Sequence, residues 1–215
     1  MHESSVIDVP AYWHRVWAER IQSPKVVKMN GPKADYLLDL LWQRRHLINM
    51  PKLEVGCGTG IHVTALRSVY PRWGKDYTGL DLAASAVAWG ASHGLDLRCV
   101  DVLEFTPDKS YGLFLFLDCL EHIEQLDAVA ARVKAWAWDK PYYVFGNVPL
   151  YRSAHETDGG FEQQMDIDVV KKFVANCGCD KLWFHVYGIG GFPYLVFEGF
   201  GRMRADDSVH HALAE

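Results

Sequence analysis

The sequence of 215 residues lacks the features that mark membrane, secreted or nucleic-acid-binding proteins. No apolar run reaches the ~20 residues that span a bilayer, and residues 1–5 show neither the basic start nor the apolar core of a signal peptide. An excess of positive charge is also missing, because 22 Lys and Arg stand against 27 Asp and Glu, for a net charge of -5. We therefore expect a cytoplasmic chain with neither a membrane nor a nucleic acid as its partner.

The five cysteines lack the spacing of a disulfide framework or a metal site. Cys177 and Cys179 are separated by one residue, where a zinc knuckle or a redox pair has two. Cys57, Cys99 and Cys119 lie inside apolar runs, where cysteine usually behaves as a small hydrophobic residue. The pattern predicts no metal and fits a reducing compartment.

Length and composition are those of one globular domain over residues 1–215, with 49% apolar and 23% charged residues. Residues 1–50 carry apolar residues at helical spacing after Pro10 and again after Pro32, which predicts a helical N-terminal cap. We expect the core of the domain over residues 51–202 and a polar tail over residues 203–215.

Strand and helix patterns alternate along the core. The expected strands are 52–56, 76–82, 96–101, 111–118, 141–147, 181–187 and 193–200, and the expected helices are 61–70, 83–93, 124–138 and 166–177. Near-continuous apolar runs suit parallel strands that are buried on both faces, and the four residues 188–191 are too few for a helical crossover. The order predicts an α/β fold with a doubly wound seven-stranded sheet, mostly parallel with a C-terminal antiparallel hairpin.

A glycine-rich turn follows the first expected strand and precedes the first helix of the core, in the stretch Glu54-Val-Gly56-Cys-Gly58-Thr-Gly60. Such a turn exposes bare backbone to a ligand at a helix N-terminus, which is typical of nucleotide sites. No Lys-Ser/Thr follows, as a nucleoside triphosphate site requires. Ile61 stands where a dinucleotide site has Gly or Ala, so a nicotinamide-dependent oxidoreductase remains as a less favoured alternative.

The glycine pattern, together with the residues at the next three strand ends, resembles class I S-adenosylmethionine-dependent methyltransferases of the small-molecule type, which are Rossmann-like. The resemblance implies a site for S-adenosyl-L-methionine, and for its product S-adenosyl-L-homocysteine, formed by Glu54, Gly56, Cys57, Gly58, Gly60, Asp81, Leu82, Asp101, Val102, Asp118 and Cys119. In this family the second strand gives an acid to the ribose and the third gives an acid to the adenine, which corresponds to Asp81 and Asp101. The segment Leu120-Glu121-His122 resembles the turn that lies beside the methyl group.

The resemblance implies methyl transfer to an oxygen or nitrogen of a small molecule, with a base where the acceptor enters protonated. We expect His122 and His155 as candidate bases, and Tyr12, Trp13, His122, Tyr151 and His155 around the acceptor. For His122 the alternative is a purely structural histidine, and for Tyr12 and Trp13 it is packing of an aromatic helix into the core. For the whole chain the alternative is a module that binds the cofactor without turnover. Asn147-Val-Pro149 resembles a motif of nucleic-acid methyltransferases but follows the wrong strand, so we expect no nucleic acid. We expect a monomer or a homodimer.

Overall fold

The structure is a computed structural model that describes residues 9–22, 39, 41–150, 162–189 and 192–202. Its centre is one seven-stranded sheet in the order β3-β2-β1-β4-β5-β7-β6. The strands are β1 (Lys52–Val55), β2 (Tyr77–Asp81), β3 (Leu97–Cys99), β4 (Leu113–Leu117), β5 (Tyr142–Pro149), β6 (Cys179–Ile189) and β7 (Phe192–Gly201). The first five are parallel, whereas β7 is antiparallel to both β5 and β6. The predicted fold class, including the C-terminal hairpin, is confirmed.

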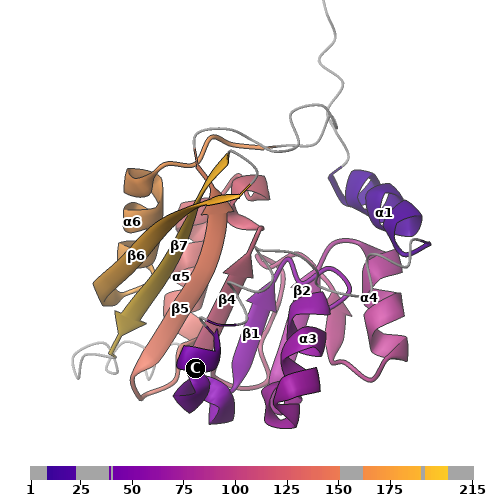
Figure 1. Cartoon of the computed structure of the whole chain (residues 1–215), viewed down its shortest axis with the longest axis horizontal. Helices are drawn as coiled ribbons and strands as arrows, with labels where there is room; N and C mark the ends of the chain where they lie inside the picture. Colours follow the sequence, from indigo (N-terminus) through magenta and orange to yellow (C-terminus); the bar gives the residue numbers. More distant parts are fainter. Residues whose placement is uncertain (1–8, 23–38, 40, 151–161, 190–191, 203–215) are drawn as a thin grey trace, which may run out of the picture.

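Helices cover both faces of this sheet (Figure 1). They are α1 (Val9–Arg20), α3 (Ile61–Val69), α4 (Ala84–Ser92), α5 (Leu126–Trp136) and α6 (Ile167–Asn176), with the short 3-10 turns η1 (Arg45–Asn49), η2 (Pro71–Gly74) and η3 (Leu120–His122). Strand β4 shows why a layer of helices is needed on each face of the sheet, because all five of its residues are buried. Phe114 and Phe116 pack into the cluster that includes α5 and α6, and the three leucines pack into the cluster that includes α3, η1 and η2.

Two strand boundaries differ from the predictions in a way that matters for the site. The strand expected over 96–101 ends at Cys99, because the backbone turns at Asp101, whose carbonyl oxygen accepts the N–H groups of Glu104 and Phe105. The strand expected over 111–118 ends at Leu117, because Asp118 has a left-handed backbone with φ of 51°. Both acids therefore lie just beyond the sheet, in turns at its carboxyl edge.

Helix α1 lies beyond the carboxyl edge of the sheet, above α4 (Figure 1). The Ser85 hydroxyl of α4 donates a 3.0 Å hydrogen bond to the carbonyl oxygen of His14. The expected helix after Pro32 lies mostly outside the described residues, of which 39 and 41–43 are helical. The polar tail lies outside them as well. Within the described residues, no helix combines the length and apolar character needed to cross a membrane.

Lys52, a buried lysine at the start of β1, connects this strand to the segments that precede β1 and β2. The Lys52 ammonium donates to the carbonyl oxygens of Ile48, Met50 and Lys75 at 2.8–2.9 Å, and the residue is 0% exposed. Burial lowers the pKa of Lys52 to about 8, so the group still carries its proton at pH 7. Its three N–H bonds match the three acceptors.

Replacing Lys52 with methionine is expected to lower the free energy of unfolding by about 2 kcal/mol, because buried carbonyl oxygens lose their donor while the aliphatic packing is kept. Urea denaturation at pH 7 measures this loss. The matched control is Lys75→Met, whose side chain is exposed and which is expected to cost less than ~0.5 kcal/mol. Equal stability of the two variants would mean that the Lys52 bonds contribute nothing.

Candidate functional site

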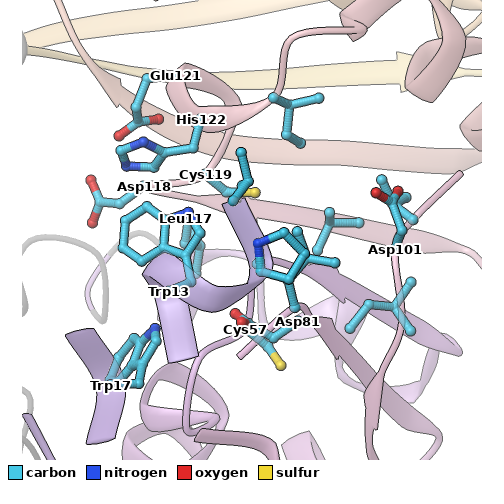
Figure 2. A pocket seen from close by; sticks show the side chains of 18 of the residues that line it. Trp13, Trp17, Cys57, Asp81, Asp101, Leu117, Asp118, Cys119, Glu121 and His122 are labelled. Atoms are coloured by element: carbon cyan, nitrogen blue, oxygen red, sulfur yellow. The ribbon is translucent and has the colours of Figure 1, made fainter. Parts of the chain in front are cut away.

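A cavity of 780 Å³ opens at the carboxyl edge of the sheet, and residues of α1 form part of its wall. The side chains around it come from α1, the glycine turn, the ends of the parallel strands and η3 (Figure 2). Strand β1 lies between β2 and β4, so the strand order reverses at this point of the sheet. Open α/β sheets bind their ligands in this crevice, and the volume is within the range of small-molecule sites.

The glycine turn needs glycine for both backbone conformation and space. Gly56, Gly58 and Gly60 have φ values of 69°, 54° and 72°, which side chains rarely adopt. A Cβ on Gly56 would lie 2.5 Å from Sγ of Cys119, and a Cβ on Gly58 would lie 2.4 Å from the Trp17 ring. The turn therefore presents bare backbone where β1 meets the cavity, and Trp17 packs directly on it.

Asp81 connects this turn to the end of β2. Its Oδ2 accepts the N–H of Gly58 at 2.7 Å, and its Oδ1 accepts the N–H of Ala83 at 2.8 Å. Burial is the main cause that raises the pKa of Asp81, and the bonds from Ala83 and Gly58 oppose this effect. Each carboxylate oxygen can accept a second hydrogen bond, and Asp81 lines the cavity. The residue can therefore shape the turn and also receive hydroxyl groups of a ligand.

Asp101 and Val102 form the wall of the cavity beyond β3. The Asp101 side chain is fixed, because its Oδ1 accepts the N–H of Leu103 at 2.8 Å. In Figure 2, Asp101 lies on the opposite side of the cavity from Asp118, Glu121 and His122. The cavity thus has two separate polar ends.

Asp118 and Cys119 lie where β4 leaves the sheet, and both line the cavity. The Asp118 backbone is left-handed, a conformation that costs a side-chain-bearing residue about 1–3 kcal/mol and is often found at functional sites. Asn147 on β5 donates a 2.7 Å hydrogen bond to Oδ1 of Asp118 and so fixes this carboxylate. Burial raises the pKa of the Cys119 thiol well above its usual value, so the thiol stays neutral.

The turn η3 places Glu121 and His122 on the cavity wall. Glu121 is only 3% exposed, and the His122 ring lies 4.7 Å from the Trp13 ring in an edge-on arrangement. Gln163 holds the turn in place: its N–H donates to the Glu121 carbonyl at 2.8 Å, and its side-chain amide donates to the carbonyls of Leu120 and Ile123. His122 is therefore rigidly placed at the end of the cavity opposite Asp101.

The structure brings together most, but not all, of the residues that the sequence suggests. Of the expected cofactor residues, those lining the cavity are Gly56, Cys57, Asp81, Leu82, Asp101, Val102, Asp118 and Cys119. Gly58 and Gly60 shape the turn without lining the cavity, and Glu54 is fully buried behind it. Of the expected acceptor residues, Trp13 and His122 line it.

Tyr12 is also placed differently from the expectation. It is 8% exposed and packs edge-on against Trp13 at 5.1 Å, outside the cavity lining. Tyr151 and His155 lie outside the described residues. Sequence reasoning missed Trp17 and His62, which both line the cavity. Trp17 is one helical turn from Trp13, and this spacing could have identified it.

Comparisons with known proteins agree with this arrangement. Residues 53–137 match the model of a protein family described as a methyltransferase domain. A ubiquinone biosynthesis O-methyltransferase of Bradyrhizobium sp. (strain ORS 278) is 27% identical over 95 residues, covering 41% of this chain and 36% of the relative. Its counterpart in Bordetella avium (strain 197N) is 33% identical over 98 residues, covering 40% and 39%. The chain thus matches little more than a third of the length of these relatives.

Two solved structures share the fold over nearly the whole chain. The magnesium protoporphyrin IX methyltransferase of Synechocystis PCC 6803 with bound S-adenosylhomocysteine has a TM-score of 0.67 at 14% identity, covering 90% of this chain and 97% of that one. A possible histamine N-methyltransferase of Thermotoga maritima has a TM-score of 0.66 at 12% identity, covering 89% and 98%. Residues 53–137 thus match a methyltransferase domain, and the chain as a whole shares the fold of these S-adenosylmethionine-dependent methyltransferases.

Proposed function

We propose that the chain transfers a methyl group from S-adenosylmethionine to an oxygen or nitrogen atom of a small-molecule acceptor. The observation that supports this most directly is the 780 Å³ cavity at the point where the strand order reverses, with Gly56 of the glycine turn in its wall. Asp81 suits the ribose, because both of its oxygens are anchored and each has a remaining lone pair. Asp101 suits the adenine amino group at the far end of the same cavity.

S-adenosylmethionine supplies a methyl group on a positively charged sulfur, which becomes a neutral thioether once the acceptor has taken the methyl. The residues of this chain mainly provide alignment and a dry site, which can contribute several kcal/mol to lowering the barrier. Trp13, Trp17 and Cys119 line the cavity with apolar surface and exclude water. His122, held beside Trp13 by the η3 turn, takes the proton from an acceptor that enters as a hydroxyl or an ammonium group.

The proposal extends to the setting of the protein. We place a single methyltransferase domain over residues 1–215, with residues 1–50 as its cap, acting as a monomer or homodimer without nucleic acid. The net charge of -5 supports the last point. All five cysteines are free thiols, which supports a reducing, cytoplasmic compartment.

Incubation with methyl-labelled S-adenosylmethionine and a panel of phenols, carboxylic acids and amines tests the activity. We expect mass spectrometry to detect at least one methylated acceptor and a stoichiometric amount of S-adenosylhomocysteine. His122→Gln is expected to slow transfer to a protonated acceptor by about 100-fold, which is a typical contribution of a general base. Tight binding of S-adenosylhomocysteine without any methylated product would instead favour a binding module.

A further inference from the structure

A histidine that the proposed mechanism does not use faces the cavity from the first turn of α3. His62 lies two residues after Gly60 and lines the cavity. Its Nδ1 is 2.8 Å from Oε1 of Glu54, with the two side chains 15% and 0% exposed. A fully buried carboxylate therefore holds this imidazole from behind.

The second oxygen of the same carboxylate is also bonded. Oε2 of Glu54 accepts a 2.6 Å hydrogen bond from the Tyr77 hydroxyl, whose pKa burial raises well above its usual value. Tyr77 therefore keeps its proton and donates it to Glu54. With Nδ1 of His62 as the other donor, Nε2 is the ring nitrogen left for a ligand in the cavity.

Charge is distributed unevenly around the cavity. Its described lining residues include the acids Asp81, Asp101, Asp118, Glu121 and Glu124 but a single Lys or Arg, namely Arg20 of α1. The Arg20 guanidinium lies 5.5 Å from the Trp17 ring, and Trp17 packs on Gly58 of the glycine turn. Arg20 reaches this turn through Trp17, and His62 follows the turn directly in α3, so both basic side chains line the cavity close to the glycine turn.

S-adenosylmethionine carries one anionic group, the α-carboxylate of its amino-acid tail. We propose that His62 binds this carboxylate through Nε2–H together with Arg20. Glu54 and Tyr77 are positioning residues that hold the ring. The inference rests on the proposed function, and it gives Glu54 an indirect role in place of the direct cofactor contact implied by the sequence.

Three ligands distinguish a contact with the carboxylate from contacts with other parts of the cofactor. S-adenosylhomocysteine has both the carboxylate and the ammonium group, its decarboxylated analogue S-adenosyl-3-thiopropylamine keeps the ammonium group alone, and 5′-methylthioadenosine has neither. Calorimetric titration measures the affinity of each ligand for the wild type and for His62→Ala. We expect the variant to bind S-adenosylhomocysteine 10- to 30-fold more weakly and to bind the other two within twofold of the wild type, because one charge-assisted hydrogen bond is lost.

Further variants test the positioning role and guard against misfolding. Glu54→Gln is expected to weaken S-adenosylhomocysteine selectively, while 5′-methylthioadenosine binding serves as proof of a folded site. His62→Gln keeps a side-chain donor and is expected to lose less affinity than His62→Ala. The matched control is His93→Ala, which removes an exposed histidine stacked on Trp89 and is expected to leave all three affinities unchanged.

Equal weakening of all three ligands by His62→Ala would overturn the inference, because His62 would then act on the shape of the turn. Weakening of S-adenosylhomocysteine and its decarboxylated analogue alike would also overturn it, since the ammonium group would be the partner. Unchanged affinities would exclude the contact. If the wild type bound none of the three ligands, the proposed function itself would fail, and this inference with it.

Discussion

Replacing Asp81 with asparagine is expected to weaken the binding of S-adenosylhomocysteine by at least 100-fold. The carboxylate is proposed to accept the two ribose hydroxyls, and hydrogen bonds to a charged acceptor contribute about 1.5–3 kcal/mol each. Every 1.4 kcal/mol corresponds to a tenfold change in affinity. Asp81 also fixes the N–H of Gly58, so the variant loses part of the turn that supports the ligand.

The same substitution is expected to change the free energy of unfolding by less than about 1 kcal/mol at pH 7, since loss of a costly buried charge offsets a lost backbone hydrogen bond. Burial raises the pKa of Asp81 above its value in the unfolded chain. The wild type therefore loses stability as the pH rises through that raised pKa, and the variant lacks this dependence. Urea denaturation across pH 3–8 measures both effects.

The control for this substitution is Asp108→Asn, which removes an exposed acid that pairs with Arg98 outside the cavity. Its affinity for S-adenosylhomocysteine is expected to equal that of the wild type. An affinity of Asp81→Asn within threefold of the wild type would contradict the assignment of Asp81 to the ribose.

Replacing Gly56 with alanine is expected to remove about 3 kcal/mol of stability and to weaken S-adenosylhomocysteine by at least 100-fold. The left-handed backbone at φ of 69° costs an alanine about 1–2 kcal/mol. The added Cβ also lies 2.5 Å from Sγ of Cys119, and such overpacking costs a further 1–3 kcal/mol, roughly. Relief of the clash moves Cys119, which lines the cavity.

A substitution at Gly94 measures the cost of backbone strain without the cost of overpacking. It also has a positive φ, 76°, but a Cβ there meets nothing within 4 Å. Gly94→Ala is expected to cost about 1 kcal/mol and to leave the affinity unchanged. Thermal and urea unfolding, with calorimetric titration, give both quantities for each variant. If the two variants lost equal stability, the contact with Cys119 would have no energetic role.

The arrangement of the cavity follows from sequence to the extent that it depends on parallel strands. Such strands all place their carboxyl ends at one edge of the sheet, so acids that follow successive strands must meet there. Asp81, Asp101 and Asp118 could therefore be grouped before any contact was known, and all three line one cavity. The glycine turn was equally predictable, because its spacing reflects left-handed backbone positions.

Side-chain contacts between different helices and strands could not be predicted from the sequence in this way. Glu54 lies in the motif itself, yet its bonds go to His62 on α3 and Tyr77 on β2, and sequence spacing does not fix such pairs. Tyr12 and Trp13 are adjacent in sequence, but the orientation of α1 on the sheet decides that Trp13 and Trp17 face the cavity. The direction of a helix face depends on packing, which one sequence leaves open.

Calorimetric titration of the wild-type chain with S-adenosylhomocysteine and with NAD+ tests the central claim, that the glycine turn and the acids beyond the strands form a site for S-adenosylmethionine. One molecule of S-adenosylhomocysteine is expected to bind per chain, at least 100-fold more tightly than NAD+. Absence of binding, or an affinity for NAD+ equal to or greater than that for S-adenosylhomocysteine, would contradict the account.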